Sequence, residues 1–198
     1  MDQRFKDREG QGLVEESVAY TIVALTSRHS MTGELLYREQ RLSDFLNDRR
    51  DTVISLRNVQ VARLNEPGKI LQLHPAAVVP KAWVLAIFEP PQKGIPPTNR
   101  FYGYVRKVTH EVFLVMEGME IRGTLHTTAD LDLRRILTGA SESFLPLTKA
   151  VVTLDANERY IIEQDAIMVN TNLIRYIAKV QVDHTPTPTS VKDPSLSR

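Results

Sequence analysis

Six basic residues are the side chains of this sequence best suited to contact a polyanion. The segment 90–107 holds four basic residues and no acidic one, and Arg49 and Arg50 stand together earlier in the chain. Cationic side chains neutralise phosphates, and the three aromatic residues within 101–104 could stack on bases. The candidate polyanion contacts are Arg49, Arg50, Lys93, Arg100, Arg106 and Lys107. A solvated linker whose aromatic rings pack on a neighbouring domain is the favoured alternative.

Acid–base or metal chemistry has one candidate cluster. Of the five histidines, only His126 is followed within six residues by two carboxylates, Asp130 and Asp132. This trio could hold a metal ion. Carboxylates at the start of a helix are more typical of capping residues, so we expect a capped helix beside a solvated histidine. The sequence predicts no metal site and no cofactor, and a metal-dependent enzyme is the third and least favoured hypothesis.

Motifs for nucleophilic or phosphate chemistry are missing from the sequence. The chain has no cysteine, which excludes thiol catalysis and cysteine-ligated metals. No glycine-rich phosphate loop occurs, and the segment 139–143 lacks the second glycine of a nucleophile elbow. The sequence therefore predicts no catalytic residue and a protein that is not an enzyme.

The elements that position these residues follow a repeat with a period near 90 residues. Gly33 corresponds to Gly123, and Leu56 to Leu147, within a longer matching apolar pattern. We predict a tandem duplication and divide the chain into a polar N-terminal segment (1–17), repeat unit 1 (18–89), a proline-rich basic linker (90–107), repeat unit 2 (108–180) and a disordered tail (181–198).

Each unit is expected to be a small five-stranded antiparallel barrel with a short helix between its second and third strands. Alternating and β-branched apolar runs predict the strands, and i, i+3, i+4 spacing predicts the helices. The strands are expected at 20–25, 31–37, 53–64, 70–73 with 76–79, and 83–88, then at 112–116, 120–126, 144–154, 160–162 with 166–169, and 173–180. The helices are expected near 42–46 and 130–137. The fold class is mainly β (α+β), and Trp83, the single tryptophan, is expected in the core.

Two stretches of the second unit resemble the Sm/LSm-like family of small, SH3-like β-barrels. Ile121-Arg122-Gly123-Thr124-Leu125 resembles the bent glycine strand of that family, and residues 169–177 resemble its last turn and strand. The resemblance implies RNA contacts from the loop after the second strand. A helix is expected in that place here, so no binding residue is carried over. Residues 41–47 and 144–148 also resemble an uncharacterised bacterial duplicated-domain family, which implies no activity.

The overall composition favours a protein partner over the other hypotheses. The chain has 25 basic and 24 acidic residues, a net charge of +1 that indicates no polyanionic partner. No apolar run reaches the ~20 residues that cross a bilayer, so a cytoplasmic protein without membrane contact is expected. The leading hypothesis is a non-enzymatic binding or assembly module that acts through protein–protein interaction or self-association. Nucleic-acid binding by a pair of Sm-like barrels with a basic linker is the second.

Overall fold

The computed structural model describes residues 19–36, 41–91, 107–138 and 142–180. The first half contains β1 (Ala19–Leu25), β2 (His29–Leu36), α1 (Leu42–Asn47), β3 (Val53–Arg63), β4 (Glu66–Pro80), the 3₁₀ turn η1 (Lys81–Trp83) and β5 (Ala86–Phe88). The second half contains β6 (Val108–Met116), β7 (Met119–Thr127), α2 (Leu133–Leu137), β8 (Phe144–Leu154), β9 (Asn157–Asn170), the 3₁₀ turn η2 (Thr171–Leu173) and β10 (Tyr176–Lys179). No helix in these ranges is long and apolar enough to cross a membrane.

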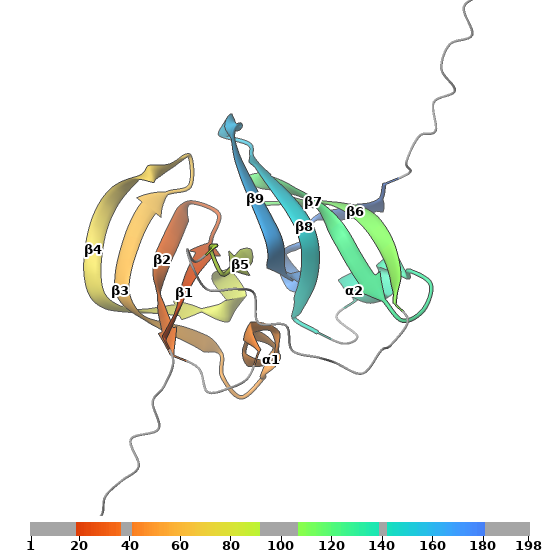
Figure 1. Cartoon of the computed structure of the whole chain (residues 1–198), viewed down its shortest axis with the longest axis horizontal. Coiled ribbons are helices and arrows are strands. Elements are labelled where there is room, and N and C mark those ends of the chain that lie inside the picture. The colour runs from red at the N-terminus through yellow and green to blue at the C-terminus, as the bar shows by residue number, and fades with distance from the viewer. Residues whose placement is uncertain (1–18, 37–40, 92–106, 139–141, 181–198) are drawn as a thin grey trace, which may run out of the picture.

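All ten strands of the described residues belong to one antiparallel sheet, and the prediction of a mainly β fold is confirmed. The strand order is β10-β6-β7-β8-β9-β5-β1-β2-β3-β4. The strands of the first half lie on one side of the molecule, those of the second half lie on the other, and β5 stands between them (Figure 1).

The prediction of closed or nearly closed barrels was wrong, because the sheet is open. The short strand β5 pairs with β1 on one side and with β9 of the second half on the other. Both sides of β5 are therefore occupied, so β4 cannot close a barrel by pairing with β5. The sheet ends at β4 and β10 within the part of the chain that the structure describes.

The fourth strand of each half is longer than expected. The segments 70–73 and 76–79 form one continuous strand, β4, and the corresponding pieces of the second half form β9. Pro75 does not interrupt β4, because a proline that lacks an N–H is tolerated where a strand has a neighbour on one side only. The expected strand at 83–88 is shortened to β5, with residues 81–83 forming η1.

A β-bulge bends the second and third strands of each half at a glycine. Two residues of β3 lie opposite Gly33, and two residues of β8 lie opposite Gly123. A Cβ atom at Gly33 would lie 3.1 Å from the Arg57 carbonyl oxygen, so only glycine lets the strands approach this closely. The bulges place Asn58 and Lys149 in left-handed conformations, with φ of 51° and 50°.

The two short helices were predicted correctly in place but differ in packing. In α1, Leu42 and Leu46 are buried, as the i, i+4 spacing of these residues predicted. In α2 no residue is fully buried. The side chain of Asp132 accepts a hydrogen bond from the backbone N–H of Arg135 at 3.2 Å, which confirms its capping role.

The two halves share their hydrophobic cores. One cluster of buried residues centres on the first half but includes Phe144 and Met168 of the second. The other centres on the second half but includes Leu25, Leu85 and Phe88 of the first. Apolar burial, the main source of folding free energy, therefore crosses the junction in both directions.

Candidate functional site

The junction between the halves is a pairing of two strand edges. Ala86 of β5 lies opposite Val169 of β9, and Ile87 lies opposite Met168. All four side chains are buried. The Asn170 N–H donates to the Leu85 carbonyl oxygen at 2.9 Å and extends the pairing by one residue. The junction therefore combines backbone hydrogen bonds with an apolar contact surface.

Two asparagines fix the junction from its sides. Asn47, at the end of α1, donates from Nδ2 to the Phe144 carbonyl oxygen at 3.0 Å and accepts from the Phe144 N–H at 2.8 Å. The buried Asn170 donates from Nδ2 to the carbonyl oxygens of Lys81 and Val84, at 3.1 and 3.0 Å. Each amide thereby satisfies backbone groups of the opposite half that would lose their hydration at the junction.

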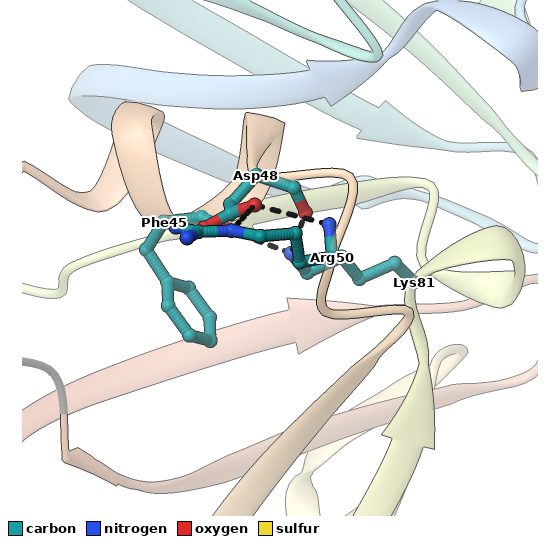
Figure 2. Close-up of polar contacts among 4 residues, drawn as sticks. All are labelled: Phe45, Asp48, Arg50 and Lys81. Atoms are coloured by element: carbon teal, nitrogen blue, oxygen red, sulfur yellow. Dashed lines mark hydrogen bonds and ion pairs between the residues drawn. The ribbon is translucent and has the colours of Figure 1, made fainter.

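Lys81 ties the end of β4 to the end of α1 (Figure 2). Its Nζ donates to the carbonyl oxygens of Phe45 and Asp48, at 2.7 and 3.1 Å, and lies 4.8 Å from the centre of the Phe45 ring. Burial lowers the pKa of Lys81 below its ordinary value. A lysine with a lowered pKa can act as a nucleophile when its nitrogen faces a substrate, but this nitrogen faces the helix end and holds it.

The loop after α1 carries an ion pair that involves one of the predicted polyanion contacts. Arg50 Nε lies 3.0 Å from Asp48 Oδ1 and 3.1 Å from Oδ2. The guanidinium and backbone N–H of Arg50 hold the pKa of the Asp48 carboxyl well below its usual range. The same contact raises the pKa of Arg50. Because Asp48 neutralises Arg50, a phosphate at Arg50 would have to compete with this carboxylate.

The other predicted polyanion contacts are spread over both halves or lie outside the described residues. Arg49 is exposed two residues after the end of α1, and Lys107 is exposed directly before β6. Lys93, Arg100 and Arg106 lie outside the described residues. Binding of a polyanion by this set therefore stays a prediction from the sequence.

Two of the three candidate metal residues, His126 and Asp132, have other partners or functions. His126 Nε2 lies 2.7 Å from the Thr148 hydroxyl oxygen, and Asp132 caps α2. No group of three histidine or carboxylate side chains that could hold a metal ion occurs among the residues with described positions.

A cavity of about 530 Å³ lies between turns of the two halves. The turns after β1 and β3 line it from the first half, and those after β6 and β8 line it from the second. Arg28, His29 and Arg63 contribute basic groups, and Asp155 contributes a carboxylate. These four side chains are all exposed, and charges of both signs give the cavity no single ligand class.

The two end strands of the sheet are the remaining candidate surface. Around β4 the structure exposes large apolar side chains, namely Val53, Ile70, Leu71, Leu73 and Val78. Beyond the end of β4, Trp83 is 73% exposed, so its predicted place in the core was wrong. Trp83 lies in the turn η1, where its burial depends on neighbouring elements that its own sequence neighbourhood does not specify.

Sequence reasoning missed these edge residues because an apolar run resembles a buried strand. The prolines of β4 are the signal that could have identified them. Pro67, Pro75 and Pro80 all lie in this strand, and proline is confined to strand ends, bulges and sheet edges.

No protein-family model, curated protein or solved structure matches the chain.

Proposed function

We propose that the protein is a non-enzymatic binding and assembly module that engages a protein partner through the open edges of its sheet. The observation that carries the proposal is the position of β4 and β10 at the two ends of the sheet, each with one neighbouring strand in the described structure. An edge strand presents backbone N–H and carbonyl groups to which a further strand can add. The exposed apolar residues around β4 supply the side-chain contacts for such a strand.

The proposal includes a tandem duplication of a five-stranded unit. Adding 90 to the register pair Val23–Phe88 of β1 and β5 gives Phe113–Ala178, which is a register pair of β6 and β10. The helix lies between the second and third strands in each half. Matched registers support a repeated unit, and a module built from repeated units joins them through matching surfaces.

The buried polar groups support a structural role over a catalytic one. Among the described residues, every buried side-chain nitrogen or oxygen has a hydrogen-bond partner. Lys81, Asn170 and Thr171 all donate to backbone carbonyl oxygens at element ends. Functional groups that act on a substrate are held with their reactive atoms accessible, whereas these atoms are occupied by the protein itself.

Photo-crosslinking tests the proposal. A benzophenone amino acid replaces Val78 of β4 or Tyr176 of β10, and the protein is irradiated in its native cell. The expected result is a discrete adduct with a protein at one or both edges. Ile161 is the matched control, because it is an exposed apolar residue of β9 outside the register pairs of the junction. Adducts at neither edge, or equal adducts at Ile161, would contradict the proposal.

A further inference from the structure

The strands at the two open edges correspond to the two strands that pair at the internal junction. The junction joins β5, the last strand of the first half, to β9, the fourth strand of the second. The open edges are β10, the last strand of the second half, and β4, the fourth strand of the first. One chain therefore carries at its ends the same two kinds of edge that already bind each other at its centre.

We propose that the protein partner is a second copy of this chain, added head to tail, with β10 of one copy pairing with β4 of the next. This inference rests on the proposed function, because it names the partner of the same two edges. Subtracting or adding 90 converts the junction pairs into the expected intermolecular register. Ile87 with Met168 becomes Ile177 with Val78, and Ala86 with Val169 becomes Tyr176 with Val79.

Apolar side chains are exposed on the β4 side at positions that are buried at the junction. Met168 is buried against the first half, whereas its counterpart Val78 is 64% exposed. Phe144 is buried in the same cluster, whereas its counterpart Val53 is 40% exposed. The β4 edge therefore has the apolar surface of one side of the junction without the cover that the junction provides.

The β10 side shows the same contrast. Ala86 is fully buried at the junction, and its counterpart Tyr176 is 54% exposed. Leu46 of α1 is buried in the cluster that contains Phe144, and its counterpart Leu137 of α2 is 44% exposed. In a second copy placed as the junction dictates, Leu137 of one chain would face Val53 and Val78 of the next, as Leu46 shares a cluster with Phe144 and Met168. Tyr176 would lie on the other face of the sheet beside Val79, as Ala86 lies beside Val169 in the other cluster. Both contacts favour association by apolar burial.

The intermolecular contact lacks the asparagine hydrogen bonds that hold the two halves together at the junction. Pro80 stands where Asn170 stands in the second half, so the N–H that donates to Leu85 has no counterpart. Thr138 stands where Asn47 stands, and its shorter side chain cannot form the two amide hydrogen bonds to the facing backbone. The association between copies is therefore weaker than the pairing of the two halves within one chain. It is also reversible and little affected by salt.

Such a contact is heterologous, since two different surfaces meet. A pair of copies still has one unpaired β4 edge and one unpaired β10 edge, to which further copies can add. Repeated addition gives a ring if the rotation between copies closes, or a filament if it does not. Sedimentation velocity of the purified full chain over a concentration series should therefore show species heavier than the 22.5 kDa monomer.

Edge-blocked variants give the decisive test. The first carries Val53→Lys and Val78→Lys, and the second carries Leu137→Lys and Tyr176→Lys; all four positions are exposed, so folding is preserved. Lysines on an edge strand or beside it oppose strand addition, and each double variant should weaken self-association about tenfold or more. A mixture of the two should form a heterodimer and nothing larger, because only one compatible pair of edges remains. Ile161→Lys is the control and should assemble like the wild type.

The outcomes separate this inference from the proposed function. Two results would overturn the head-to-tail inference. One is a wild-type chain that stays monomeric at every concentration. The other is a single edge-blocked variant that dimerises with itself as tightly as the wild type associates. If the monomeric chain still forms edge-specific photo-adducts with a different protein, the proposed function stands. If those adducts are missing as well, both are overturned.

Discussion

Asn47 and Phe144 lie 97 positions apart in the chain and form a reciprocal pair. The Asn47 amide donates to the Phe144 carbonyl oxygen and accepts from the N–H of the same residue. One side chain thus replaces a strand neighbour at the start of β8, while the Phe144 ring enters the core of the first half. The pair connects the end of α1 to the second half through both polar and apolar contacts.

Asn47→Ala should lower the free energy of unfolding by about 2 kcal/mol, because the N–H and carbonyl groups of Phe144 lose their partner in a part-buried position. Urea denaturation measures the change. Asn157→Ala is the matched control, since Asn157 also crosses the junction but makes one exposed bond of 3.3 Å, to Asn65. Its expected effect is about 0.5 kcal/mol or less. Equal effects of the two substitutions would contradict the role assigned to Asn47.

Asn170→Asp should destabilise the protein by about 3 kcal/mol at neutral pH, because a carboxylate cannot donate to the two carbonyl oxygens that Asn170 contacts. The folded state favours the protonated carboxyl, so its pKa rises above the ~3.9 of an unfolded aspartate. The loss should therefore be smallest below about pH 4 and grow as the pH rises through the folded-state pKa. Denaturation curves of the variant and wild type over this range measure it, and a loss that shrinks with rising pH would refute the assignment.

We expect the free energy of unfolding to rise at alkaline pH because of Lys81. Burial puts its folded-state pKa below the ordinary 10.5, so the unfolded chain holds the proton more tightly between the two values. The free energy of unfolding therefore increases with pH across that interval. Lys81→Met removes this contribution, so the stability of wild type relative to the variant should grow as the pH approaches 10.5. Lys107→Met, at an exposed lysine, is the control for titration of the remaining chain, and a constant wild-type advantage would contradict the prediction.

The local structure of this protein can be predicted well from its sequence, because local structure depends on periodicity and on single residues. The spacing of Leu42 and Leu46 identified α1, and Asp132 was recognised as a capping residue. Barrel closure was predicted wrongly because it depends on which strand occupies the outer side of β5. That side is taken by β9, and no local pattern in either strand specifies a partner about 80 residues away.

The candidate surface was harder to predict than the fold. Val78 and Trp83 have apolar side chains that a burial rule places in the core, yet both are exposed. Burial is a property of the neighbours that cover a position, and Met168, the counterpart of Val78, is buried because β5 lies beside it. A sequence shows which side chains could be buried, whereas only the strand order shows which of them are covered by a neighbouring element.

Lys149→Asn should stabilise the protein by about 0.5 to 1 kcal/mol. Lys149 has φ of 50° at the bulge of β8, a conformation that asparagine adopts at lower cost than lysine. The equivalent bulge of β3 already has Asn58, with φ of 51°. Asn58→Lys is therefore the reciprocal variant and should destabilise by a similar amount. Thermal denaturation of both variants measures the effect, and changes of the same sign would contradict the equivalence of the two bulges.

Paired cysteines should report both the junction and the intermolecular contact, because the chain has no cysteine of its own. Ala86→Cys with Val169→Cys in one chain should oxidise to an intramolecular disulfide, since register partners in an antiparallel sheet lie within disulfide range. Mixing Tyr176→Cys chains with Val79→Cys chains should give a disulfide-linked heterodimer on non-reducing gels. Tyr176→Cys mixed with Ile161→Cys is the control, because Ile161 lies outside the expected register. Trapping at Ile161 that equals trapping at Val79 would show random collision, whereas selective trapping at Val79 follows only from head-to-tail pairing in the register of the junction.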